Sequence, residues 1–476
     1  MSEPVLPAYA RPGQPIPSIG DLGKVHFVGI GGAGMSGIAR IMLAMGMQVS
    51  GSDAKESATL RDLQARGATT FTGHAASHIA GADTVVVSSA IRPNNLELLA
   101  ARENNVNIVP RAMALASLMQ GRHAVAVAGT HGKTSTTSML VAAAQAAHAD
   151  PSYAIGGELN ESGSNAHLGT GDIFIAEADE SDGSFLLFAP FAGIVTNVEA
   201  DHLDNYGDLA AVLRAFEAFV QTIDPAGFLI LCRDDERSFA LAKIAQARNL
   251  PVYTYGVHQD SDLRLENIVV IGTRTTYTAV IGELQYPVDL GAPGEHMARN
   301  SAAALLSGLR LGLSAGELLV GLARFGGVHR RMELIGQAHG IRIFDDYAHH
   351  PTEIVAQLRA ARQVAGDGKV IACFQPHLYS RTQAFGTDFG NALGLADRVV
   401  VMDVFGARED PIPGVSGAVV AAAVPESVQS VTFEPSWAKT ARLLADLAEP
   451  GDLLITLGAG DITMVGPEVL ALLEQR

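Results

Sequence analysis

Short apolar runs alternate with stretches of helical length along most of the chain. The first apolar run, "KVHFVGI", begins at Lys24 and is followed by a glycine turn and by "GMSGIARIMLAMG", which has helical length. A second apolar run, "MQVSGSD", then ends at Asp53, and "TVVVSSA" follows at residues 84–90. Buried strands that alternate with helices in this way predict an open, doubly wound parallel sheet.

The same alternation returns twice, which predicts an α/β protein of three domains. We expect a loose N-terminal arm at residues 1–20, a Rossmann-like domain at 21–121, a central P-loop-type ATPase domain at 122–327 and a second Rossmann-like domain at 328–476. Near the end of the central domain, "RLENIVVIGTRTTYTAVIGELQYPVDL" alternates over several short segments and predicts a small additional antiparallel sheet. A length of 476 residues fits three domains.

Composition narrows the classes of partner. The net charge of -17 argues against a nucleic-acid backbone as partner. Two cysteines, Cys232 and Cys373, lie far apart, so a reducing compartment fits better than a disulfide framework. We find neither an apolar run long enough for a membrane span nor a signal peptide, and we expect a cytoplasmic protein.

Two glycine loops stand out, each between a predicted strand and a predicted helix. The first, Gly29 to Gly34, matches G-x-G-x-x-G, and Asp53 ends the next strand. This pattern predicts that the pyrophosphate of a nucleotide lies at a helix N-terminus, without indicating which nucleotide. The second, "GTHGKTSTT", begins at Gly129 and resembles a P-loop, although Val127 stands where the standard motif has glycine. Backbone N–H groups, Lys133 and the hydroxyl of Thr134 would hold phosphates and Mg²⁺. A chance glycine turn is the alternative.

Polar clusters follow the later strands. "EADESD" provides Glu177, Asp179, Glu180 and Asp182. "EADHLD" provides three further acids, Glu199, Asp201 and Asp204, together with His202. Acids at adjacent strand ends favour a Mg²⁺ site over solvated loop residues. "DDYAHHP" at 345–351 and "FQPHLYSRT" at 374–382 bring histidines, a tyrosine and Arg381 to parallel loops, which indicates a binding site for a carboxylate or an amine.

Taken in order, these motifs resemble the Mur ligases, ATP-dependent enzymes that form amide bonds in peptidoglycan precursor synthesis. The resemblance rests on "HFVGIGGAGMSGIA", "GTHGKTSTT", "EADESDGSF", "TNVEADHLD", "RRME", "DDYAHHPTE", "FQPHLYSRT" and "LGAGDI", which together span most of the chain. It implies that the first loop binds UDP-N-acetylmuramate and the second binds ATP. It also implies that L-alanine is joined to the muramyl carboxylate through an acyl phosphate, with Mg²⁺ or Mn²⁺ as cofactor and a monomer or weak homodimer as the working form.

The resemblance also implies roles for individual residues, carried over where this chain matches the family motifs. Those implied for ATP are Gly129, Thr130, His131, Gly132, Lys133, Thr134, Ser135, His296, Asn300, Arg331 and Asp346. Those implied for the sugar nucleotide are Gly29, Gly31, Gly32, Ala33, Gly34, Asp53, Ser88, Ser89 and Arg111. Those implied for L-alanine are Tyr347, His349, His377 and Arg381. Those implied for the metal are Thr134, Glu177 and His202. Those implied for catalysis are Lys133, His202, Arg331, His349 and Arg381.

This chain departs from the family at three places, and three alternative functions stay open. His296-Met297 replaces the common His-Asn pair, Leu378 replaces an arginine of some relatives, and the helix after His202 has no lysine for carbamylation.

A ligase that recycles a whole peptide would share the N-terminal and ATP motifs. An NAD-dependent oxidoreductase would leave "GTHGKTSTT" unexplained, and an ATP-hydrolysing regulator would leave the loops of the last domain without a purpose.

Overall fold

Three β-sheets with flanking helices make up the protein. The structure, a computed structural model, describes residues 15–160, 163–407 and 409–476. The sheets have five, ten and six strands. The chain divides into two compact units, the first reaching Leu265 and including residues 279–285 and 300–324, the second formed by residues 266–278, 286–299 and 325–476. The predicted α/β class is thereby confirmed.

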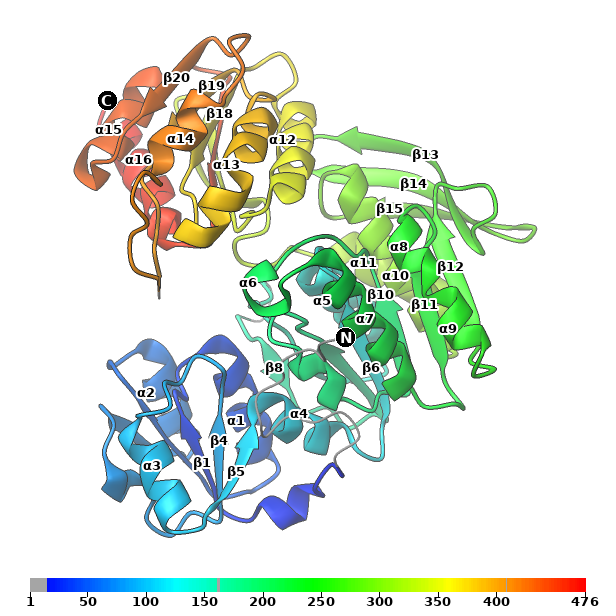
Figure 1. Ribbon diagram of the computed structural model, residues 1–476. Coiled ribbons are helices and arrows are strands. Elements are labelled where there is room, and N and C mark those ends of the chain that lie inside the picture. The colour runs from blue at the N-terminus through cyan, green and yellow to red at the C-terminus, as the bar shows by residue number, and fades with distance from the viewer. Residues whose placement is uncertain (1–14, 161–162, 408) are drawn as a thin grey trace. The chain divides into compact units, whose positions relative to one another are not determined.

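The first sheet is parallel throughout, with the strand order β3-β2-β1-β4-β5. Its strands are β1 (Val25–Val28), β2 (Val49–Asp53), β3 (Thr69–Thr72), β4 (Thr84–Val87) and β5 (Asn107–Pro110). Its helices are α1 (Ala33–Ala44), α2 (Ala58–Ala65), α3 (Leu96–Glu103) and α4 (Arg111–Met119), as Figure 1 shows. Val86 packs with α1, α2 and α4, whereas its neighbours Val85 and Val87 pack with α3. Alternate side chains of one strand thus fill opposite faces of the sheet.

A buried carboxylate lies in the first domain. Glu97 has no exposed side-chain area and accepts hydrogen bonds from Ser52 (2.5 Å) and from the ring nitrogen of His78 (2.7 Å). His74 and His26 also contact its carboxylate. Burial alone would raise the pKa of Glu97, but its interactions with His26, Ser52 and His78 prevail and hold the pKa at about 2. Glu97 is therefore a buried anion that depends on its hydrogen-bond partners.

The second sheet has the order β15-β14-β13-β12-β11-β10-β6-β9-β7-β8. Its strands are β6 (His123–Ala128), β7 (Ser152–Ala154), β8 (Ala166–His167), β9 (Ile173–Glu177), β10 (Ala192–Val195), β11 (Phe228–Cys232), β12 (Val252–Gly256), β13 (Leu263–Ile271), β14 (Arg274–Ile281) and β15 (Leu284–Leu290). The accompanying helices are α5 (Lys133–Ala146), α6 (Leu203–Tyr206), α7 (Leu209–Thr222), α8 (Glu236–Ala240), α9 (Ala242–Gln246), α10 (Glu295–Arg310) and α11 (Ala315–Arg324). The strands from β12 through β6 to β7 are parallel, so their carboxyl ends share one edge.

The third sheet has the order β16-β17-β21-β18-β19-β20. Its strands are β16 (Glu333–Ala338), β17 (Ile341–Asp346), β18 (Val370–Phe374), β19 (Arg398–Val401), β20 (Ser430–Phe433) and β21 (Leu453–Leu457). Its helices are α12 (Pro351–Ala365), α13 (Tyr379–Leu393), α14 (Gly417–Ala422), α15 (Trp437–Leu447) and α16 (Val465–Glu474). Helices α12 to α14 cover one face, and α15 and α16 cover the other. Only β16 is antiparallel among the strand pairs described in this sheet.

Three further predictions concern single segments. Of the predicted N-terminal arm, residues 1–14 lie outside the described residues, and Ser18 caps a short 3₁₀ helix, η1 (Ile19–Leu22). Cys232 and Cys373 are free and buried, as the sequence led us to expect. Among the described helices, none combines the length and the apolar character needed to cross a bilayer.

Candidate active site

The first glycine loop joins β1 to α1 and leaves the helix start open. Gly32 is the N-cap of α1 and has no side chain to cap it. The N–H of Gly31 donates to Oδ2 of Asp53 at 3.0 Å, which fixes the turn. A Cβ on Gly31 would lie 2.8 Å from that same oxygen, so glycine is required for this approach. The first turn of α1 therefore presents backbone N–H groups and the positive end of the helix dipole, an arrangement suited to an anion.

Residues from three other strand ends surround this helix start. Ser88 and Ser89 directly follow β4, and Arg111 is the first residue of α4. Because β1 lies between β2 and β4, the ends of these strands reach one edge. The Arg111 guanidinium is so close to Gly34 that a Cβ there would lie 2.6 Å from Nη1. The structure thus brings the predicted sugar-nucleotide residues to a single edge.

Arg111 also contacts an acid of the central domain. Its Nη2 lies 3.4 Å from Oδ2 of Asp179. Burial would raise the pKa of Asp179, but the charges of Arg111 and Lys133 lower it to about 2. Asp179 is therefore an anion that links the cations of the two glycine loops.

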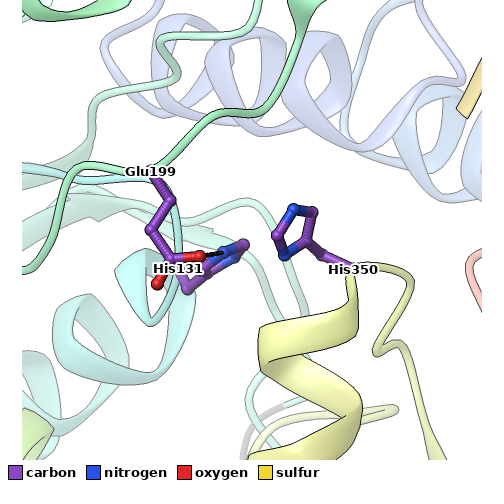
Figure 2. Close-up of side chains that lie close together, drawn as sticks. All are labelled: His131, Glu199 and His350. Atoms are coloured by element: carbon purple, nitrogen blue, oxygen red, sulfur yellow. Dashed lines mark ion pairs between the residues drawn. The ribbon is translucent and has the colours of Figure 1, made fainter. Parts of the chain in front are cut away.

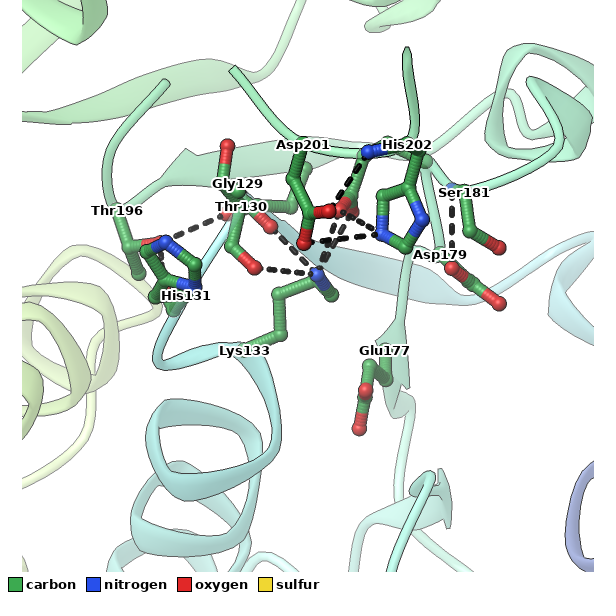
Figure 3. Close-up of polar contacts among 12 residues, drawn as sticks. Gly129, Thr130, His131, Lys133, Glu177, Asp179, Ser181, Thr196, Asp201 and His202 are labelled. Atoms are coloured by element: carbon green, nitrogen blue, oxygen red, sulfur yellow. Dashed lines mark hydrogen bonds and ion pairs between the residues drawn. The ribbon is translucent and has the colours of Figure 1, made fainter. Parts of the chain in front are cut away.

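The second glycine loop joins β6 to α5 and is held from behind by β10. Gly129 has a φ of 135°, and a Cβ on it would lie 2.0 Å from Oγ1 of Thr196, so the loop accepts only glycine here. The N–H of His131 donates to Oδ1 of Asn197 at 2.8 Å, and Thr196 donates to the carbonyl of His131 at 2.6 Å, as Figure 3 shows for Thr196. Val127 is buried within β6, so the strand continues through the position where a standard P-loop has glycine.

Lys133 occupies the centre of this loop. Its Nζ donates to the carbonyls of Gly129 (2.7 Å) and Thr130 (3.0 Å), both labelled in Figure 3. It also pairs with the Glu180 carboxylate at 2.8 Å. Burial would lower the pKa of Lys133, but the negative charges around it, first that of Glu180, raise the pKa instead. The lysine is thus a fixed positive charge at the start of α5.

The predicted metal ligands fall into two adjacent groups. Thr134 donates to Oε1 of Glu177 at 3.0 Å, and the N–H of Gly156 donates to its Oε2 at 2.8 Å. His202 instead lies beside Glu180, with Nε2 at 3.6 Å from Oε1, and beside Asp201. A hydroxyl and carboxylates are the oxygen donors that Mg²⁺ and Mn²⁺ prefer, so the first group fits either ion.

The remaining ATP-loop residues surround the same strand ends. Nε2 of His131 lies 3.4 Å from Oε2 of Glu199, as Figure 2 shows, and the N–H of Glu199 donates to Oγ1 of Thr130. Ser135 is buried in the first turn of α5. Asn300 of α10 packs against the loop, because a Cβ on Gly132 would lie 2.7 Å from its Oδ1. The structure therefore brings Asn300 to the loop, and its role as a nucleotide contact stays a prediction.

Three residues of this site have no individual role in the prediction from sequence. They are Glu180, which is one of four acids in its motif, Thr196 and Asn197. "VTNVEADHLD" contains both of the latter directly after a buried strand, and that position was the available signal. Glu180 is buried and pairs with Lys133. The two residues lie far apart in the sequence, so no local sequence pattern predicts this contact.

The second unit gathers the candidates from the last domain. The Tyr347 and His349 rings lie 5.3 Å apart, those of His349 and His377 lie 6.2 Å apart, and the Arg331 guanidinium lies 5.3 Å from the Tyr347 ring centre. Arg381 is buried in α13. These contacts join loops after β17 and β18, at the edge where the sequence predicted a binding site.

Two of the candidate site residues in the second unit, Asp346 and His296, have shifted pKa values. Asp346 ends β17 and accepts hydrogen bonds from the N–H groups of Met332 (2.7 Å) and Ala348 (2.8 Å). Burial raises its pKa to about 7, against the opposing charge of Arg331. Burial also lowers the pKa of His296 to about 4, with Arg299 and Arg331 acting in the same direction, so this imidazole is neutral at pH 7.

Comparison with known families covers nearly the whole chain. Residues 24–123 match the model described as Mur ligase family, catalytic domain. Residues 127–308 match the Mur ligase middle domain, and residues 330–460 match the model described as Mur ligase, glutamate ligase domain. The three matches follow the order of the three sheets.

Individual relatives are similar to this chain over nearly their full length. UDP-N-acetylmuramate–L-alanine ligase of Saccharopolyspora erythraea is 55% identical, over 95% of this chain and 94% of its own length. The enzyme of that name from Kineococcus radiotolerans is 52% identical, over 98% and 99% of the two chains. Among solved structures, UDP-N-acetylmuramate-alanine ligase of Thermotoga maritima superposes with a TM-score of 0.80 at 28% identity, covering 95% of this chain and 99% of its own. A murein peptide ligase of Psychrobacter arcticus gives a TM-score of 0.69 at 25% identity, with the same coverage.

Proposed function

The chain belongs to the Mur ligase family, and we propose that it joins L-alanine to the carboxylate of UDP-N-acetylmuramate at the expense of ATP. The observation that carries this proposal is the presence, in one unit, of two glycine loops that suit two different nucleotides. The first loop offers a helix start and Arg111 to a pyrophosphate. The second offers a lysine and a hydroxyl-carboxylate pair to a phosphate that is transferred.

The reaction needs an activated carboxylate, because a carboxylate ion does not react with an amine directly. ATP transfers its terminal phosphoryl group to the muramyl carboxylate, which gives ADP and an acyl phosphate. The amine of L-alanine attacks the acyl carbon, and phosphate leaves from the tetrahedral intermediate. Lys133 is placed to neutralise charge on the transferred group, since its ammonium lies inside the loop that holds the phosphates.

We further propose that Thr134 and Glu177 hold Mg²⁺, with His202 serving a second ion. The hydrogen bond from Thr134 to Glu177 already sets two oxygen donors side by side. A bound Mg²⁺ would supply charge neutralisation between the phosphates. Glu180 pairs with the Lys133 ammonium at 2.8 Å, and nucleotide phosphates would compete with it for this cation.

In the last domain, we assign Tyr347, His349, His377 and Arg381 to L-alanine. A guanidinium is suited to the amino-acid carboxylate, and the imidazoles to the amine. Leu378, which replaces an arginine of some relatives, is buried and leaves Arg381 as the basic residue for this role. Arg331 and Asp346 are assigned to ATP, as the family resemblance implies. Cytoplasmic location and a monomeric or weakly dimeric state complete the proposal.

Two related activities are separated by a single assay of phosphate release from ATP and Mg²⁺. We expect release only when UDP-N-acetylmuramate and L-alanine are both present. Release that requires a preformed peptide in place of L-alanine would identify a peptide-recycling ligase. ATP hydrolysis without any acceptor would contradict both. The full-length identity of about one half to L-alanine ligases favours the first outcome.

A further inference from the structure

A chain of side-chain hydrogen bonds joins helix α1 of the first domain to strand β8 of the central domain, within the first unit. Asn165 directly precedes β8, and its Nδ2 donates to the carbonyl of Ala33 at 2.6 Å. Its Oδ1 accepts from Nη1 of Arg40, also at 2.6 Å. Nε of Arg40 donates in turn to Asp62 of α2 at 3.0 Å. Asn165 is only 1% exposed, so both ends of its amide are used inside the protein.

The residue that Asn165 contacts is the first residue of α1. Ala33 opens the helix whose N-terminus is proposed to receive the pyrophosphate, and no side chain caps that terminus. A bond from Asn165 to its carbonyl holds the first turn from the central-domain side. A donor in this position ties the first turn of α1 as a whole to the central domain.

Gly37 makes this contact possible. It lies in the middle of α1, where glycine destabilises a helix by about 0.5–1 kcal/mol relative to alanine. A Cβ at Gly37 would lie 3.2 Å from the Cβ of Ala166 and 3.4 Å from Nδ2 of Asn165. Glycine at this point thus allows β8 to approach the helix closely enough for the two hydrogen bonds of Asn165.

Asn165 also lines a small pocket beside the first loop. Its other walls include Gly34 of that loop, Arg111 at the start of α4, and the acids Glu177 and Asp179, at and just after the end of β9. A sugar nucleotide held by the first loop must extend through this region for its carboxylate to reach the phosphates of ATP. Small displacements of α1 would therefore displace the reacting carboxylate.

We propose that Asn165 is a positioning residue that sets the first turn of α1 against the central domain, so that the bound sugar nucleotide presents its carboxylate to the second loop. This inference rests on the proposed function. It assigns Asn165 no contact with the reacting atoms, since both ends of its amide are bonded to Ala33 and Arg40. Its expected signature is a loss of kcat with nucleotide affinities retained.

The test compares Asn165→Asp and Asn165→Ala with wild type in the complete enzyme. Aspartate still accepts from Arg40 but cannot donate to Ala33. We expect kcat to fall about 10- to 100-fold in both variants, since a misplacement of about 1 Å costs this much. The Kd of UDP, measured by calorimetry, and the KM of ATP should stay within about threefold, because each nucleotide contacts mainly its own loop.

Two further variants keep the result interpretable. Arg66→Ala removes an exposed partner of Asp62, leaves Arg40 and Asn165 paired, and should keep wild-type kcat. Arg40→Ala should lower kcat in the same direction as Asn165→Ala, and the double variant should lose less than the product of the two effects. Asn165 variants that melt at a lower temperature but keep kcat would overturn the inference. A loss of UDP affinity as large as the loss of kcat would overturn it as well. A wild-type enzyme without turnover would instead overturn the proposed function on which the inference rests.

Discussion

The two glycine loops share one plan but obtain their positive charge in different ways. In each, a buried parallel strand turns at glycine into a helix. The first loop has no lysine, and the guanidinium beside it is that of Arg111, which directly follows β5. The second has Lys133 as the first residue of its helix, and the loop's own carbonyls fix the ammonium.

This difference fits the two different tasks that we propose for the loops. A pyrophosphate that is only held needs backbone N–H groups and a positive field, and a cation borrowed from a neighbouring strand suffices. A phosphoryl group in transfer develops charge that must be neutralised at a fixed point, so the cation is built into the loop. Asp179 lies between the two cations and is influenced by both.

The largest expected effect comes from removing the fixed charge. We predict that Lys133→Met lowers kcat on the order of 10²–10³-fold, since it removes the charge that faces the transferred phosphoryl group. The affinity for UDP should not change. Steady-state kinetics with Lys243→Ala, an exposed lysine of α9, provides the matched control. Wild-type kcat in the Lys133 variant would remove the distinction between the loops.

The next effect concerns the metal. Thr134→Val removes a hydroxyl that now bonds to Glu177 and should raise the Mg²⁺ concentration for half-maximal rate about 10- to 100-fold. Thr137→Val changes a hydroxyl of the same helix that bonds to the carbonyl of Lys133, and it should leave the Mg²⁺ requirement near that of wild type. Magnesium titrations of the rate for both variants check this. An equal shift in both would point to a general disturbance of α5.

A smaller, selective effect is expected in the first loop. Gly34→Ala places a Cβ 2.6 Å from Nη1 of Arg111 and pushes the guanidinium from the helix start. We predict an increase of about tenfold in the KM for UDP-N-acetylmuramate, the value of one charge-assisted hydrogen bond, with the KM for ATP unchanged. Gly316→Ala in α11, where a new Cβ would meet no atom within 4 Å, is the control. A rise in the KM for ATP instead would mean that the loops are not independent.

The smallest effect on catalysis belongs to Glu97, which should influence stability alone. Its folded pKa of about 2 lies below the ordinary value of 4.5, so its stabilisation is present above pH 4.5 and is lost as the pH falls towards 2. Glu97→Gln should lower the free energy of unfolding on the order of 2–3 kcal/mol at pH 7. Urea unfolding should show the gap between wild type and variant narrowing below pH 4.5. A gap independent of pH would show that the carboxylate charge is not its source.

Much of the site follows from the sequence because its parts are local. Each loop lies between an apolar run and a helix, and the acids of "EADESD" directly follow β9, so position along the chain predicts the edge on which they gather. Glu177 ends β9 and bonds to Thr134, the pair that the motifs suggested. The α/β class and the parallel sheets follow from the same alternation.

The remainder depends on contacts without a local pattern. Nothing in the spacing of the acids distinguishes Glu180, which pairs with Lys133, from Glu177, because the chain is irregular after β9. The contact between Asn165 and Ala33 joins residues 132 positions apart. Strand β3 has no fully buried position. Its residues therefore form no apolar run from which the strand could be predicted.

The most direct test of the two-loop account is calorimetric binding of UDP-N-acetylmuramate and of a non-hydrolysable ATP analogue to Arg111→Ala and Lys133→Met. We predict that Arg111→Ala loses affinity for the sugar nucleotide and keeps the ATP analogue, whereas Lys133→Met shows the reverse. If either variant lost both ligands equally, or if both variants lost the same one, the assignment of one nucleotide to each loop would be wrong.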